Sequence, residues 1–156
     1  MGRKRSETTA SALEDHIGYW LRYVSNHVSS SFAHDLTKSG VSVSEWVALR
    51  KLYDLGESTQ NELAAAMGMT KGPISRILDR LLRKKLVSRK DSPSDGRAHV
   101  VRLTEAGSRL VPKLAEIADR NDAAYFAALT EGDRNAILRI MRKLVAHHEL
   151  KSVPVD

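Results

Sequence analysis

Side chains that can neutralise phosphate groups are concentrated in one part of this chain. Residues 71–102 contain ten Lys or Arg and three Asp, a formal charge of +7, whereas the remaining residues sum to −1 within a total of +6. Solvation of a surface does not require such a concentration of charge, but contact with a polyanion does. The distribution therefore predicts that residues 71–102 form a surface for nucleic acid.

The segment that leads into this basic region carries the signals of two short helices. Thr59 and Glu62 form a capping box that begins the first helix, and Gly68 can end it because glycine enters the left-handed conformation without strain. Thr70 is placed to cap the second helix, and Pro73 falls in its first turn, where a missing N–H does little harm. Two helices joined by a short turn that contains Gly are typical of a helix-turn-helix.

The second of these helices has an apolar side and a basic side. Such a helix can rest on a core with one side and enter a major groove with the other. A surface helix with solvated charges has the same pattern, so the helix alone leaves both interpretations open. The apolar set is Ile74, Ile77, Leu78, Leu81 and Leu82, and the opposite set is Gly72, Arg76, Asp79, Arg80 and Arg83.

Two short strands follow the helix pair and favour the nucleic-acid interpretation. Residues 86–90 and 99–103 have partial strand alternation, and the loop between them contains the turn signal Asp95-Gly96. A helix-turn-helix followed by a basic hairpin is a winged helix. Arg97 would lie beside Asp95 at the tip of the wing.

This region resembles the multiple-antibiotic-resistance regulator (MarR) family, and a looser resemblance extends from about Leu13 to about His148. The resemblance implies a mainly α fold, in which long N- and C-terminal helices form a dimerisation region around a winged helix-turn-helix. It also implies a homodimeric repressor on a pseudo-palindromic operator. The matching residues are Glu62, Leu63, Ala64, Gly68, Thr70, Ile74, Ser75, Arg76, Leu81, Lys85, Leu86, Val87, Arg89, Asp95, Gly96, Arg97 and residues 103–107.

A winged helix of this type would contact double-stranded DNA in three ways. We expect the second helix to enter the major groove, with an open glycine that allows the backbone to approach closely, and Arg97 to enter the minor groove, held by Asp95. Lys71, Arg80, Arg89 and Lys90 would contact phosphates. The residues facing the major groove would be Thr70, Lys71, Gly72, Ser75, Arg76 and Arg80.

Long helices are expected on both sides of the winged helix. One runs from about Ala12 to about Leu36, one from Thr104 to about Leu129 with a kink or break near Pro112, and a last one follows Thr130. Their apolar stripes could pack within one chain or across a dimer, and the family favours the dimer. The residues assigned to the dimer interface are Leu13, Ile17, Leu21, Ile137, Met141, Leu144 and Val145.

These elements divide the chain into five segments. We expect a disordered basic tail over 1–10, an N-terminal dimerisation helix over 11–40 and the winged helix-turn-helix over 41–103. C-terminal helices over 104–150 would complete the dimerisation region, and 151–156 would be a loose tail.

Two tryptophans could line a site for an effector. In the family, a cleft between the dimerisation and DNA-binding lobes takes small aromatic or phenolic anions. Trp20 and Trp46 could stack on such a ligand, Arg50 could neutralise it, and His16 could face it. The alternative is that both tryptophans belong to the core and that His16 lies on the surface.

The sequence offers no support for catalysis or a cofactor. It has no cysteine and no nucleophile–base pair at a recognisable spacing, and the adjacent His147 and His148 cannot share a helix face as a metal chelate. No apolar run is long enough to span a membrane. We therefore expect a non-enzyme without metal or cofactor. The family resemblance implies a location in the bacterial cytoplasm, associated with the nucleoid. The alternatives are a sequence-neutral nucleoid or RNA-binding protein and a helical scaffold that binds protein.

Overall fold

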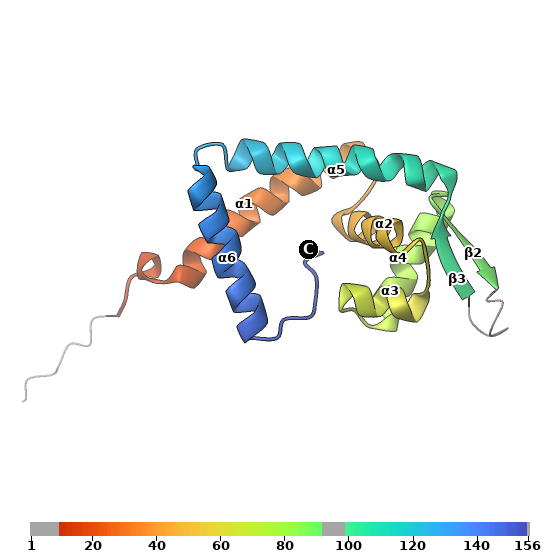
Figure 1. Cartoon of the computed structure of the whole chain (residues 1–156), viewed down its shortest axis with the longest axis horizontal. Helices are drawn as coiled ribbons and strands as arrows, with labels where there is room; N and C mark the ends of the chain where they lie inside the picture. Colours follow the sequence, from red (N-terminus) through yellow and green to blue (C-terminus); the bar gives the residue numbers. More distant parts are fainter. Residues whose placement is uncertain (1–9, 92–98, 156) are drawn as a thin grey trace, which may run out of the picture.

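The structure, a computed structural model, describes residues 10–91 and 99–155. It is mainly helical with one small sheet, as the sequence predicted. In Figure 1 the long helix α5 runs along one side of the molecule, and α2, α3, α4 and the sheet gather at one of its ends. We call that compact unit the reading head. The elements are η1 (Leu13–Asp15), α1 (Ile17–Lys38), α2 (Val43–Leu55), β1 (Glu57–Thr59), α3 (Gln60–Met67), α4 (Lys71–Arg83), β2 (Val87–Asp91), β3 (His99–Leu103), α5 (Glu105–Tyr125) and α6 (Glu131–His147).

Local capping interactions fix where most of these helices begin. The hydroxyls of Ser42, Thr59 and Thr130 each accept a backbone N–H three residues later, and a carboxylate at that later position accepts the cap's own N–H. Gly68 ends α3 in the left-handed conformation, with φ of 62°. Thr70 occupies the N-cap position of α4 as predicted, although its side chain makes no capping hydrogen bond.

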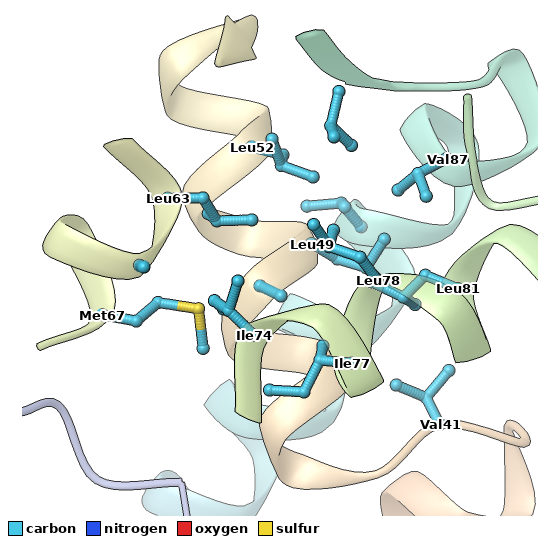
Figure 2. Close-up of a cluster of buried hydrophobic side chains, with 14 of the residues drawn as sticks. Val41, Leu49, Leu52, Leu63, Met67, Ile74, Ile77, Leu78, Leu81 and Val87 are labelled. Carbon is cyan, nitrogen blue, oxygen red and sulfur yellow. The ribbon is translucent and has the colours of Figure 1, made fainter. Parts of the chain in front are cut away.

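The core of the reading head lies where α2, α3 and α4 converge. Figure 2 shows aliphatic side chains from the three helices meeting in one cluster with Val87 of β2. The apolar side predicted for α4 is confirmed, because Ile74, Ile77, Leu78 and Leu81 are buried and Leu82 is half-buried. Burial of this side fixes which side of α4 faces solvent.

A small antiparallel sheet forms the base of the wing. Its strand order is β1-β3-β2, and Ser58 in β1 is paired with Val101 in β3. The two strands of the hairpin were predicted, whereas β1 was not. Residues 92–98 between β2 and β3, including Asp95 and Arg97, lie outside the described residues.

The long helices differ from the prediction at their ends and at a proline. The 3₁₀ turn η1 delays the start of α1 to Ile17, and α5 ends at Tyr125. The predicted break near Pro112 is wrong, because α5 continues through it. Pro112 and Ser108 are both exposed, so the Ser108 carbonyl that loses its N–H partner can be solvated.

The expected loose tail is also wrong. The C-terminal segment Lys151–Val155 returns from the end of α6 towards the reading head (Figure 1). The N–H of Val153 donates to the carbonyl of Met67 at 3.3 Å, and Val153 and Val155 are half-buried against the core. Contact with the core therefore orders this segment.

The joint between the wing and α5 is tightly packed. Thr104 donates its N–H to the Leu86 carbonyl at 3.0 Å and its hydroxyl to the Lys85 carbonyl at 2.8 Å, while the same hydroxyl accepts the N–H of Gly107. A Cβ on the buried Gly107 would collide with the Leu86 carbonyl oxygen. Within residues 103–107, these contacts and the close backbone approach explain the presence of Thr104 and Gly107 at the start of α5.

The close approach at Gly107 leads to a prediction about stability. Gly107→Ala should lower the free energy of unfolding by about 1–3 kcal/mol, because the added methyl must displace backbone atoms. Gly18→Ala is the matched control, since Gly18 is also helical but an added Cβ would meet no described residue within 4 Å, and it should be neutral or stabilising. Urea unfolding would measure both variants. Equal stability of the two would contradict the packing argument.

Candidate nucleic-acid interface and neighbouring cavity

The solvent-facing side of α4 carries the candidate reading residues. Arg76, Asp79 and Arg83 are exposed on the side opposite the buried aliphatic residues. A Cβ at Gly72 would meet no atom of residues 10–91 or 99–155 within 4 Å, so in that part of the chain nothing covers the backbone at the start of α4. An α4 fixed by its core and bearing a free basic side has the form that major-groove recognition needs.

A buried carboxylate holds α4 against α2. Glu45 is 1% exposed, and its two oxygens accept from Arg80 Nε at 3.0 Å and Lys84 Nζ at 2.6 Å. The same Lys84 Nζ donates to the Gly40 carbonyl at 2.7 Å, and the Ser42 N–H donates to Glu45 Oε2 at 2.9 Å. One carboxylate therefore caps α2 and fixes the C-terminal half of α4.

The charge of Glu45 is stabilised by these neighbours. Burial by itself raises the pKa of the carboxyl, but the hydrogen bonds from Lys84, Ser42 and Arg80 outweigh it, so the pKa lies below its ordinary value. Glu45 is therefore ionised in the folded chain at neutral pH. The side chains of the two basic partners, Arg80 and Lys84, are 38% and 39% exposed, so both are partly open to solvent.

Arg80 has a structural partner that the sequence analysis did not foresee. Its Nε is bound to Glu45, and its side chain is 38% exposed. Its assignment to DNA contact stays a prediction. The spacing of Ser42 and Glu45 in the sequence indicates only a capping box, because a partner 35 or 39 residues away from Glu45 leaves no periodic signal.

The other predicted DNA-contact residues fall on two neighbouring elements. Thr70, at the cap of α4, and Lys71 are exposed, and Ser75 is half-buried. Arg89 and Lys90 are on β2, where an Arg89 guanidinium nitrogen lies 3.9 Å from a carboxylate oxygen of Asp79 on α4. Their roles in DNA binding remain predictions, as do those of Asp95 and Arg97.

A cavity of about 430 Å³ lies between α1 and α2. Trp46 and Phe32 supply aromatic surface, and the Ser29 and Ser30 side chains are its polar groups. None of the lining residues in the described part of the chain is charged. The lining residues are Ser29, Ser30, Phe32, Ala33, Val43, Trp46, Val47 and Pro154.

Of the residues predicted to contact an effector, only Trp46 lines this cavity. Arg50 is paired with Asp54 and lies over the Tyr53 ring.

The other two predicted effector contacts are near the start of α1. Trp20 Nε1 donates to the Glu14 carbonyl at 2.9 Å, and His16 Nδ1 is 2.9 Å from the Ala12 carbonyl oxygen. Trp20 also belongs to an aromatic cluster with Tyr19, which is half-buried, and Tyr23, which is exposed.

The comparison with known proteins agrees with the geometry of the reading head. A model of the MarR family matches residues 41–99, which include α2, α3, α4 and β2. The chain is also 28% identical to the HTH-type transcriptional repressor NicR of Pseudomonas putida over 143 residues, covering 92% of this chain and 90% of that protein. This chain therefore resembles the MarR family, through its reading head and through a relative that matches nearly its whole length.

Solved structures of MarR-type regulators have the same fold. The S. aureus MepR–DNA complex matches with a TM-score of 0.76 and 25% identity, covering 85% of this chain and 98% of that one. The Bordetella bronchiseptica regulator BpsR, whose DNA binding is regulated by 6-hydroxynicotinic acid, matches with a TM-score of 0.77 and 24% identity over 86% of this chain and 96% of that one. The MarR family is one of transcription regulators and not of enzymes.

Two further sequence expectations concern metals and membranes. Within residues 10–91 and 99–155, no cluster of His, Asp and Glu is arranged to hold a metal ion. In the same part of the chain, no helix combines the length and apolarity needed to cross a membrane.

The Glu45 network predicts a pH-dependent contribution to stability. Glu45→Gln keeps an oxygen for the Ser42 N–H but loses both ion pairs, so it should lower the free energy of unfolding by about 1–3 kcal/mol at pH 7. Because the folded pKa of Glu45 is lowered, the contribution is complete above the ordinary value near 4.5 and is lost as pH falls through the folded pKa.

Unfolding of the two proteins between pH 3 and 7 would measure this contribution. The gap in stability between wild type and Glu45→Gln should close towards acid. Glu116→Gln, which removes an exposed carboxylate 3.9 Å from Arg120, should change stability by less than about 0.5 kcal/mol. A gap that persists unchanged at the lowest pH would show that the ion pairs are not its source.

Proposed function

We propose that this chain is a MarR-type, sequence-specific repressor that binds a pseudo-palindromic operator as a homodimer and is released by a small aromatic or phenolic effector. The observation that carries the proposal is the two-sided α4. Its aliphatic side is buried, Glu45 fixes its C-terminal half, and Arg76 projects from the exposed side.

Base readout by α4 follows from its rigidity and side-chain chemistry. An arginine fork matches the two acceptors of guanine in the major groove, provided that the helix carrying it is held in register. Lys71, Ser75 and the open backbone at Gly72 would approach from the first turn of α4. Phosphate contacts by Lys71, Arg80, Arg89 and Lys90 would set that register.

The wing contributes charge rather than sequence discrimination in this proposal. Arg97, oriented by Asp95, would enter the minor groove, where electrostatic potential and groove width are read. This assignment rests on the sequence alone. Replacing Arg97 should weaken binding evenly across DNA sequences.

Exposed apolar surface at both ends of the chain supports a homodimer. On α1 and just before it, Leu13 and Ile17 are 67% and 78% exposed. On α6, where no residue is buried, Met141, Leu144 and Val145 are exposed. A second copy of the chain would remove these surfaces from water, together with Leu21 and Ile137.

The cavity between α1 and α2 supports an effector with an aromatic ring. Trp46 and Phe32 offer faces for stacking, and the hydroxyls of Ser29 and Ser30 could pair with a phenolic hydroxyl. BpsR provides a precedent, since 6-hydroxynicotinic acid regulates its DNA binding. An effector of this protein would release DNA by binding better to a dimer whose two reading heads are wrongly spaced.

The reading role of α4 predicts that Arg76→Ala changes specificity as well as affinity. Selection from a random duplex pool would first provide the operator. Arg76→Ala should then weaken operator binding and reduce discrimination at one position of each half-site by about 1–3 kcal/mol. Lys113→Ala removes one charge from the exposed side of α5 and should leave that discrimination intact.

Titrations against operator and scrambled duplex at several salt concentrations would measure this effect. If Arg76→Ala lowered both affinities in equal proportion, α4 would not read bases. That result would favour the sequence-neutral nucleoid or RNA-binding alternative.

The dimer proposal predicts a clear effect of charge on α6. Leu144→Asp places a carboxylate in the proposed interface and should yield monomers or aggregates, as measured by sedimentation at micromolar concentration. Asn135→Asp adds the same charge at an exposed polar position of α6 and should leave the dimer intact. A wild-type monomer that still binds a palindrome would refute the proposal.

The uncharged lining of the cavity predicts which effectors bind best. 4-Hydroxybenzyl alcohol, which is neutral, should quench tryptophan fluorescence at least as effectively as the anion 4-hydroxybenzoate, and Trp46→Ala should abolish the response. The better ligand should lower operator affinity. A strong preference for the anion would instead indicate a cation such as Arg50 at the binding site.

A further inference from the structure

The C-terminal segment Lys151–Val155 contacts the turn between α3 and α4. Val153 donates its N–H to the Met67 carbonyl at the end of α3, and the Ser152 hydroxyl donates to the Gly68 carbonyl, both at 3.3 Å. Val153 and Val155 also pack against the core of the reading head. Figure 1 shows the chain end between α6 and the reading head, so this segment connects two parts of the fold.

The same segment forms part of the cavity wall. Pro154 lines the cavity opposite residues contributed by α1 and α2, among them Phe32 and Trp46. Pro154 directly follows the residue that binds Met67. A molecule that fills the cavity and contacts Pro154 would therefore contact the segment that holds the α3–α4 turn.

The absence of a side chain at Gly68 allows this segment to pack closely against the α3–α4 turn. A Cβ at Gly68 would lie 2.5 Å from both the Lys151 carbonyl oxygen and the Ser152 Cα. The glycine thus serves two purposes, the left-handed end of α3 and the close approach of the C-terminal backbone. Gly40 is a natural control, because its φ of 71° is similarly positive but a Cβ built there would meet no described residue within 4 Å.

We infer that Lys151–Val155 is a strap that belongs to the effector site and positions the helix-turn-helix through Met67 and Gly68. The inference deepens the proposed function, on which its link to an effector rests. An effector that touches Pro154 favours the docked strap, and linkage requires that the docked strap favour the effector equally. Since the proposed effector weakens DNA binding, the docked strap belongs to the state with lower operator affinity.

Two full-length variants would detach the strap from opposite sides. Gly68→Ala places a methyl group where the backbone of the strap packs against Gly68. Val153→Pro removes the N–H that donates to the Met67 carbonyl. In a Trp20→Phe background, Trp46 is the sole tryptophan and reports on the cavity. Both variants should shift Trp46 emission to the red and increase its quenching by acrylamide, whereas Gly40→Ala should change neither. If quenching were unchanged in both variants, the inference that Lys151–Val155 is a strap over the cavity at Trp46 would be overturned.

Operator binding tests the positioning role with the same variants. Gly68→Ala and Val153→Pro should both bind the selected operator about five-fold more tightly or better, and Gly40→Ala should match the wild type. Increased quenching without a change in affinity would overturn the positioning role, as would weaker binding by both variants. The quenching experiment needs neither DNA nor effector, so it separates failure of the strap from failure of the proposed repressor function.

Discussion

The position of α4 depends on one buried carboxylate. Glu45 begins α2 by accepting the Ser42 N–H and also binds Arg80 and Lys84 near the end of α4. A buried charge with any of these partners missing would be costly, so the network tolerates few alternative arrangements of the two helices. The aliphatic core shown in Figure 2 keeps α4 from leaving α2, and Glu45 restricts its sliding and rotation.

Local interactions made much of the fold predictable from sequence. The boxes of Thr59 with Glu62 and Ser42 with Glu45 span three residues, and the buried side of α4 repeats at helical spacing. β1 has no such pattern, because Glu57–Thr59 is a strand only through its pairing with β3. The same limit applies to the C-terminal strap, whose order comes from contact with residues more than 80 positions earlier.

The candidate sites show the same difference between features set by local interactions and features set by long-range contacts. Exposure of Arg76 and the open backbone at Gly72 follow from helix periodicity, so the sequence located them. The cavity is assembled from α1, α2 and the strap. Among the residues that line it, only Trp46 was assigned to an effector site from the sequence. Arg50 has the right charge for an anion and a plausible helical spacing, but pairing with Asp54 and contact with Tyr53 occupy it instead.

The joint at Gly107 has a mechanical consequence. At Gly107 the backbone of α5 lies against the Leu86 carbonyl, just before β2, and residue 107 has no side chain that could change rotamer and absorb a displacement. The long α5 and the base of the wing therefore move together as one rigid body. At its other end, α5 reaches the connection to α6 (Figure 1). Any movement of the reading head relative to α5 must therefore come from bending within the reading head or within α5, and not from a hinge at their junction.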